Sequence, residues 1–457
     1  MPPPPQSNIP YAESFRCIGS ACEDTCCQGW GVPIDQAAYE KYQHLPDGQL
    51  RTRIDANLLV MPEGAKPANF AKIRMDGENQ CPLLTNDHLC LIQLELGTEY
   101  LSHSCATYPR IIHTIGKIQE MALTLSCPEA ARLVLLTPEL FVREPLESDL
   151  VPNEATAGAP AAPGASSLLP WFWPIRRVVL ALVGNRVYPL WQRLFLLGVF
   201  CRRLDSISRG ELARSVPAFL GDFQAAVTSG SLRPAMEALP LDRAAQLDVV
   251  LRLAGILLHR SNVRPRFVEC VQAFTTGIGN GPGATLESLT EDYAQAHDRY
   301  FAPFFDQHPY ILENYLANTI IRCRFPFGKE ETQAGELPSM AREYALLTAQ
   351  FALVKGFLIG VAGCHGEAFA AEHVVHTVQA ISKHFEHHPK FLNLAYELLM
   401  ESQMDGARGL AILLRNAEPI PQRPTAPEVQ VPGPQEEMPS AAQIWLKADP
   451  QGARNSS

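Results

Sequence analysis

Cysteines are concentrated at the start of this 457-residue chain. Four of them follow a C-x4-C-x3-C-C pattern within eleven residues. Buried free cysteines usually occur singly, as small apolar residues, so core packing explains this density poorly. The cysteines of the first 127 residues are Cys17, Cys22, Cys26, Cys27, Cys81, Cys90, Cys105 and Cys127. We expect these eight thiols to be the ligands of a metal site.

The expected compartment decides how these thiols are interpreted. Met1 is followed by four prolines, without the basic and apolar segments of a secretory signal. The apolar stretches 190–200 and 351–363 are short for a bilayer span and contain Arg193 and Lys355. We therefore expect a cytoplasmic protein with no membrane association. Thiols stay reduced in the cytoplasm and disulfides are uncommon there, which favours a metal site.

The overall composition limits the class of protein further. Apolar residues make up 46% of the chain and charged residues 19%, which is typical of a soluble globular protein. The formal net charge of −10 argues against nucleic-acid binding, which normally requires a basic face.

Proline, glycine and small polar residues divide the chain into four parts. Residues 8–150 form a cysteine-rich metal-binding or iron–sulfur region, and residues 171–417 form a second, longer region. Residues 151–170 are expected to be a flexible linker, and the proline-rich residues 418–457 a disordered tail, because neither contains enough apolar surface to offset the entropy of ordering.

The second region has the periodicity of α-helices. Apolar residues recur at spacings of three and four over residues 190–204 and 247–258, and residues 343–362 and 371–385 are further helix candidates. The glycines of residues 356–363 lie inside a helical pattern, which indicates close helix packing rather than a donor-binding loop. The expected fold is mainly α, with the cysteine-rich region packed against a helical C-terminal domain.

The spacing of the early cysteines bears on which metal they hold. Thiolates select zinc, copper(I) or iron–sulfur clusters. Structural zinc sites normally use paired C-x2-C arms, and the chain contains no C-x2-C. Iron–sulfur clusters accept wider spacings and a distant fourth ligand. We therefore favour an iron–sulfur cluster, expected to be 4Fe–4S, with zinc, disulfides and free thiols as alternatives.

Several short motifs occur in a fixed order along the chain. They are residues 15–30, Val32-Pro-Ile-Asp35, Cys81-Pro-Leu-Leu84, Cys105-Ala-Thr-Tyr-Pro-Arg110, Leu125-Ser-Cys-Pro-Glu-Ala-Ala-Arg132, Asn314-Tyr-Leu316 and Arg324-Phe-Pro-Phe-Gly328. In these motifs the chain resembles the bacterial flagellin lysine-N-methylases of the FliB type. The cysteine-rich segment also resembles a broader class described as zinc- or iron-chelating.

The resemblance implies an activity and its partners. It implies methyl transfer from S-adenosylmethionine to the ε-amines of surface lysines on flagellin. The eight early cysteines are carried over as metal ligands, whereas no donor-binding motif can be placed on this chain. The alternative is a non-catalytic metal-binding protein or a redox iron–sulfur protein.

Lysine methylation sets a chemical requirement of its own. Presenting a neutral lysine amine at pH 7 costs roughly 4–5 kcal/mol, because the ordinary pKa of lysine is about 10.4. A direct transfer therefore needs desolvation or a nearby base, whereas a radical reaction would not. The catalytic candidates beside the cysteines are Glu23, Asp24, Tyr108, Arg110 and Glu129. Of these, Arg110 is expected to pair with a carboxylate or to offset the charge of an anionic cluster.

Overall fold

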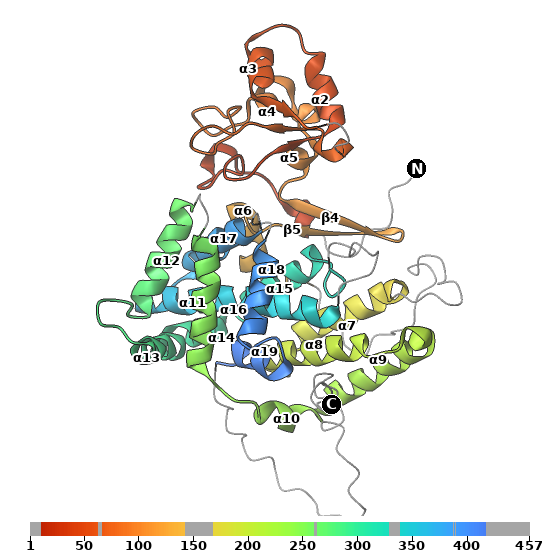
Figure 1. Ribbon diagram of the computed structural model, residues 1–457, viewed down its shortest axis with the longest axis vertical. Helices are drawn as coiled ribbons and strands as arrows, with labels where there is room; N and C mark the ends of the chain where they lie inside the picture. The colour runs from red at the N-terminus through yellow and green to blue at the C-terminus, as the bar shows by residue number, and fades with distance from the viewer. Residues whose placement is uncertain are drawn as a thin grey trace, which may run out of the picture.

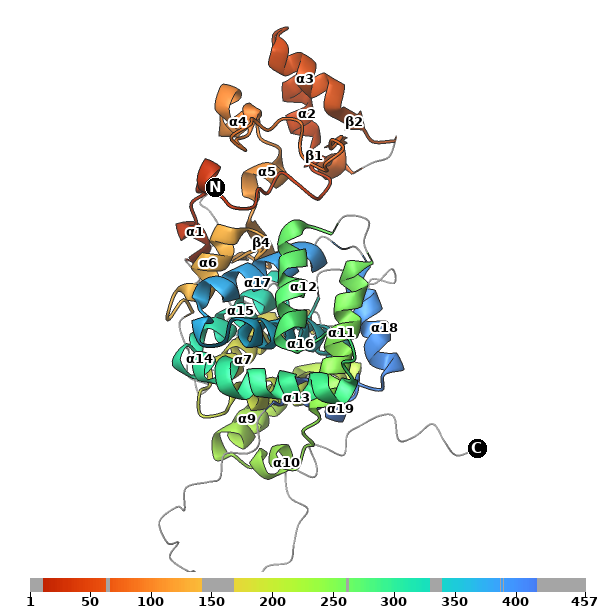
Figure 2. The same cartoon turned by 90° about the vertical axis from the view of Figure 1, so that its left-hand side faces the viewer.

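The computed structural model describes residues 11–62, 66–141, 168–259, 263–328, 339–386, 388 and 390–416. These residues form a small lobe and a larger helical body, as Figures 1 and 2 show. The small lobe comprises residues 17–107, and the helical body comprises the remaining described residues. The predicted tail lies outside the described residues, and so does the predicted linker apart from its last three residues. Of these, Leu169 and Pro170 already belong to a 3-10 turn, Leu169–Trp171, that leads into the body.

The small lobe is built from short elements around its own hydrophobic core. It contains a three-stranded antiparallel sheet with the order β1-β3-β2. The core includes Val32, Ile34, Tyr42, Ile54 and Ile92. The elements are β1 (Pro33–Ile34), α2 (Gln36–Gln43), α3 (Gln49–Asn57), β2 (Leu58–Val60), β3 (Ala71–Ile73), α4 (Leu91–Leu96) and α5 (His103–Thr107).

A β-hairpin and a helix connect the lobe to the body. The hairpin pairs β4 (Arg110–Ile115) with β5 (Ile118–Leu123), and α6 (Pro128–Leu136) follows it. Leu123 of β5 and the buried apolar side chains of α6 and of α1 (Tyr11–Ser14) belong to the core of the helical body. The boundary between the two cores therefore falls inside residues 8–150 and not at their end.

The body is made of helices, so the predicted, mainly α fold is confirmed. The predicted helices at 190–204, 247–258, 343–362 and 371–385 all form. The helices are α7 (Phe172–Gly184), α8 (Leu190–Asp205), α9 (Leu212–Ser229), α10 (Arg233–Glu237), α11 (Arg243–Leu258), α12 (Pro265–Gly277), α13 (Leu286–Ala296), α14 (Ala302–Gln307), α15 (Tyr310–Arg322), α16 (Met340–His365), α17 (Ala371–Phe385), α18 (Phe391–Glu401) and α19 (Ala407–Leu414).

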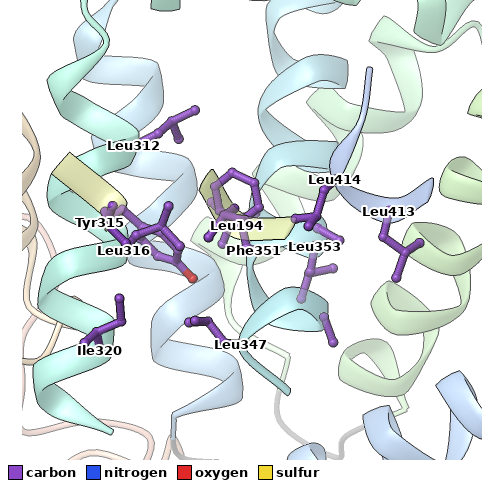
Figure 3. Packing of buried hydrophobic residues seen from close by; sticks show 14 of the residues in the cluster. Leu194, Leu312, Tyr315, Leu316, Ile320, Leu347, Phe351, Leu353, Leu413 and Leu414 are labelled. Carbon is purple, nitrogen blue, oxygen red and sulfur yellow. The ribbon is translucent and has the colours of Figure 1, made fainter. Parts of the chain in front are cut away.

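Helix α16 is the centre of the body. Its Leu347, Phe351 and Leu353 pack among apolar side chains of α8, α15 and α19 (Figure 3). Met340–Ala368 is long and apolar enough to cross a membrane, which corrects the expectation that every apolar stretch is too short. Its most apolar window is wholly buried inside the body, as in the core helix of a globular protein.

The glycines of α16 allow another helix to approach closely, as the sequence predicts. A Cβ atom at Gly277 of α12 would lie 1.7 Å from the carbonyl oxygen of Gly360. A Cβ at Gly360 or Gly363 would likewise meet α12 at less than 3 Å. The glycine-rich stretch is therefore a helix-packing surface between α12 and α16.

Buried polar side chains attach the hairpin and α6 to helix α15. Asn318 is fully buried. Its side-chain oxygen accepts hydrogen bonds from the Tyr11 hydroxyl at 2.6 Å and from the Leu123 amide at 3.1 Å. Its side-chain nitrogen donates one to the Leu123 carbonyl at 2.8 Å. One turn earlier, Asn314 donates to the carbonyls of Val134 and Thr137 at 2.9 Å. These bonds satisfy backbone groups that the body would otherwise bury unpaired.

Lys355 in α16 makes the stability of the body dependent on pH. Its ammonium group is buried and donates to the carbonyls of Leu413 and Leu414 at 2.9 and 2.8 Å and to the Asn416 side chain, at the C-terminal end of α19. Burial lowers the pKa of Lys355 to about 7. Between pH 7 and about 10.4 the unfolded chain holds a proton that the folded chain lacks, so this lysine makes stability rise with pH by about 4 kcal/mol.

The variant Lys355→Met removes this contribution, so the natural protein and the variant are compared at each pH. We expect the free energy of unfolding of the natural protein, minus that of the variant, to increase between pH 7 and pH 9.5 in urea titrations. A difference that stays constant over this range would contradict the assignment.

Candidate metal and catalytic site

Three segments of the small lobe bring the early cysteines together. The Cys81 amide donates to the Cys27 carbonyl at 2.8 Å, and the Gly29 amide donates to the Asn79 carbonyl at 2.9 Å, which joins the first cysteine loop to the second. Cys90 is the residue that precedes α4, and Cys105 lies in α5. Cysteines separated by up to 79 residues therefore meet in one place.

Cys26, Cys81, Cys90 and Cys105 form a group that we name the thiol quartet. Each is a free, half-buried thiol, and the charge of each member acts on the other three. Burial, with a smaller effect of neighbouring thiolates, raises the pKa of Cys81 to about 11 and that of Cys105 to about 12, and it also raises the pKa of Cys90. Such thiols become thiolates only if positive charge is supplied beside them.

The quartet is not arranged as a ready site for a single metal ion. Within the described residues, no three His, Cys, Asp or Glu side chains are arranged to hold a single metal ion. Around tetrahedral zinc, with Zn–S bonds of about 2.3 Å, the sulfurs lie roughly 4 Å from one another. An iron–sulfur cluster places its own iron and sulfide atoms between its ligands, so it takes thiolates that lie farther apart.

The other four early cysteines lie around this group. The Cys27 sulfur is 3.8 Å from that of Cys26; this contact, together with the Lys383 ammonium, lowers the pKa of Cys26. Cys22 and the buried Cys127 both interact electrostatically with Cys26. Cys17 is exposed. The eight predicted ligands are therefore an inner quartet, three close neighbours and one exposed thiol.

Tyr108 and Trp30 form an aromatic wall beside the first cysteine loop. Their rings stack with centroids 6.4 Å apart, and the Trp30 indole donates to the Cys26 carbonyl at 2.6 Å. Burial raises the pKa of Tyr108 well above its ordinary value, with the Cys127 thiolate adding to the effect. The phenol therefore stays protonated at neutral pH, and the predicted catalytic candidate Tyr108 is placed next to the thiols.

Asp24 docks the first cysteine loop on the helical body. One carboxylate oxygen accepts from the Lys383 ammonium at 2.6 Å and the other accepts from the Gln379 amide at 2.7 Å, both in α17. The Arg264 guanidinium lies 3.5 Å away at the start of α12. The Lys383 ammonium also donates to the Thr25 carbonyl at 2.9 Å. Asp24, predicted as a catalytic candidate, is thus occupied by donors from the body.

Gly29 completes this contact. Its φ of +91° is unfavourable for other residues, and a Cβ atom there would lie 2.1 Å from an Arg264 nitrogen. Arg264 also donates to the Gln28 side chain at 3.2 Å. The loop therefore needs glycine at this position so that the arginine from α12 can lie against its backbone.

Two other candidates have structural partners. Glu23 forms a partly exposed ion pair with Arg132 at 2.7 Å. Arg110 donates to the carbonyls of Ala12 and Phe15 at 3.0 and 2.9 Å, so the expectation that it pairs with a carboxylate is wrong. Arg110 holds α1 against the hairpin because its fork of donors matches two neighbouring carbonyls.

Sequence reasoning missed the residues that the body contributes. Lys383 and Gln379 lie more than 350 residues from Asp24 in the sequence. Trp30 belongs to the first family motif, but the motif alone does not indicate its contact with Tyr108. The sequence carries one signal of this contact, which is that Lys383 lies on an otherwise apolar face of its helix. A charge that is buried in this way requires a partner of opposite charge.

Comparison with known proteins gives a consistent result. The family model described as the FliB lysine N-methylase C-terminal domain matches residues 176–413. Proteins named lysine-N-methylase from Salmonella typhimurium and Salmonella choleraesuis are each 25% identical over 354 residues, which is 74% of this chain and 84% of those proteins. The flagellar biosynthetic protein FliU of Salmonella muenchen is 33% identical over 130 residues, 28% of this chain and 76% of that protein. No solved structure matches the chain.

Proposed function

The chain belongs to the FliB lysine N-methylase family and is a protein-lysine methyltransferase, and on this premise we propose that it methylates surface lysines of flagellin with S-adenosylmethionine as donor. The flagellar name of the FliU relative supports flagellin as the substrate. The proposal places the reaction in the cytoplasm, where a reducing environment keeps the early thiols available for metal.

We further propose that the thiol quartet holds an iron–sulfur cluster. The observation that carries this proposal is that four thiols, those of Cys26, Cys81, Cys90 and Cys105, lie close enough to interact with one another. Burial raises the pKa of the last three, whereas the Cys27 thiol and the Lys383 ammonium lower that of Cys26. Soft thiolates are the ligands that such clusters take. When bound, a cluster would supply the positive charge that these thiolates need beside the aromatic wall.

The surrounding residues have defined roles in this proposal. Asp24, Lys383 and Arg264 hold the first cysteine loop against the helical body, so that the quartet keeps its position relative to α12 and α17. Trp30 and Tyr108 cover one side of the loop and exclude water from it. The donor-binding residues stay unassigned, because no described feature identifies them.

Methyl transfer is tested directly with labelled donor. Flagellin is incubated with the anaerobically purified protein and S-adenosylmethionine labelled in its methyl group, and hydrolysed flagellin is analysed for labelled N-methyl-lysine. The proposal expects label in lysine only when protein, donor and flagellin are all present. An intact cluster without any label transfer would instead indicate a redox protein, and label in another amino acid would refute the lysine assignment.

A further inference from the structure

Direct lysine methylation must dispose of a proton. The lysine ammonium has to lose one proton before its nitrogen lone pair can form the new N–C bond, while the donor's C–S bond breaks and sulfur keeps the electron pair. At pH 7 this deprotonation costs roughly 4–5 kcal/mol. Asp24 and Glu23 are engaged by Lys383 and Arg132. A third carboxylate, Glu386, is connected to the aromatic wall by hydroxyl groups.

A chain of hydroxyl groups leads away from the aromatic wall. The Tyr108 hydroxyl lies 3.2 Å from the Ser126 hydroxyl, which lies 2.9 Å from the Thr124 hydroxyl. The Thr124 hydroxyl in turn donates to the Glu386 carboxylate. Ser126 and Thr124 are buried, and the side chain of Glu386 is only 6% exposed. The chain runs within the helical body, from the residues that follow β5 to the residue that follows α17.

The carboxylate gives this chain a direction. An ionised Glu386 accepts and cannot donate, so the Thr124 hydrogen points to it. Thr124 must then accept from Ser126, and Ser126 must accept from Tyr108, because each hydroxyl has one hydrogen. All three hydrogens therefore point toward Glu386, which leaves the Tyr108 oxygen free to accept a proton on the side of the aromatic wall.

We propose that Tyr108, Ser126, Thr124 and Glu386 form a proton relay that carries the substrate ammonium's proton from the thiol site to Glu386. This inference rests on the proposed function and on direct methyl transfer to nitrogen. Tyr108 takes one proton from the ammonium and passes its own to Ser126, Ser126 passes one to Thr124, and Thr124 passes one to the carboxylate. The sum is a neutral lysine amine and a protonated Glu386, and no tyrosinate is formed.

The geometry around Glu386 places it at the end of the hydroxyl chain. It follows α17 directly. The charged and titratable groups that face it are Arg322 and Tyr315 of α15 and Tyr108 at the other end of the chain, with the Arg322 Nε atom 3.4 Å from a carboxylate oxygen.

A matched pair of variants tests the relay. Thr124→Val keeps the size of the side chain and breaks the chain of hydroxyls, whereas Thr124→Ser keeps the hydroxyl. We expect Thr124→Val to lower kcat for flagellin methylation about 100-fold at pH 7, within the usual range for general-base catalysis. We expect no change in KM, and a rate for Thr124→Ser within a few-fold of the natural protein.

The pH profile separates proton transfer from a structural role. As the pH rises toward 10, substrate lysine becomes neutral in solution, so the ratio of the rate of the natural protein to that of Thr124→Val should fall toward one. Glu386→Gln, which still accepts from Thr124 but cannot take a proton as a carboxylate does, should show the same recovery and can be used even if Thr124→Val does not fold.

Several outcomes would overturn the relay. Full activity of Thr124→Val at pH 7, or an equal loss at every pH in both variants, would refute it. Natural protein that transfers no methyl group at all would refute the proposed function before any variant is compared, so the two failures are distinguishable.

Discussion

Cys105→Ser is expected to remove bound iron from the protein and to lower methyl transfer at least about 100-fold. Cys105 is one of four mutually interacting thiols, and burial raises its pKa to about 12. Serine offers a hard oxygen ligand where the cluster requires a soft thiolate. Even residues that only orient a metal ligand usually affect affinity or activity 10–100-fold, so loss of a ligand itself should exceed that range.

The matched control is Cys364→Ser. Cys364 is an exposed thiol at the end of α16, outside the small lobe. Iron content is measured by absorption spectroscopy and chemical analysis, and activity by label transfer to flagellin. Natural iron content and activity in Cys105→Ser would exclude the quartet as the cluster site. An equal loss in Cys364→Ser would show that thiols are needed generally and not at this site.

Arg176→Met is expected to destabilise the folded protein by about 3–5 kcal/mol, the cost of breaking a buried ion pair. Arg176 donates to the Glu120 carboxylate at 3.0 Å and to the carbonyls of Ile320 and Phe325 at 3.0 and 2.7 Å. Both charged side chains are at most 3% exposed. Removal of the arginine takes a charged donor from a buried carboxyl group and from two carbonyls, of which that of Ile320 keeps the Phe325 amide.

Two further variants make this prediction specific. Arg132→Met removes a partly exposed arginine from its ion pairs, and we expect it to cost less than about 1 kcal/mol. Adding Glu120→Gln to Arg176→Met should recover part of the loss, because no charge then stays buried alone. Urea unfolding measures all three variants. A cost for Arg176→Met no larger than that of Arg132→Met would contradict the role given to the buried pair.

The helices of the body could be predicted because helical periodicity is a local property. In α17 the buried apolar residues Val374, Val378, Ile381 and Phe385 are each three or four residues from the next, a spacing that the sequence alone displays. The division into two cores could not be predicted in this way. It depends on Asn318 and Arg176, whose hydrogen bonds reach β5 from other parts of the chain, and no spacing reveals such partners.

The candidate site was predictable to a similar extent. Cysteine density and the family motifs identified the thiols and Tyr108, because these residues lie close together in sequence. The partners of Asp24 come from α12 and α17, and Glu386 lies 262 residues from Thr124, so the docking contacts and the relay emerge only from the fold. For Arg110 the expected partner was a carboxylate, whereas in the structure the arginine donates to backbone carbonyl groups.

The central claim is that methyl transfer depends on a cluster held by the thiol quartet. It is tested most directly by measuring the rate of N-methyl-lysine formation on flagellin with one anaerobic preparation in three states: as purified, after removal of metal, and after reconstitution with iron and sulfide. We expect iron and acid-labile sulfide in equal amounts in the first and third states, with activity lost in the second and restored in the third. Full activity of the metal-free protein, or stoichiometric zinc without sulfide in the active protein, would contradict it.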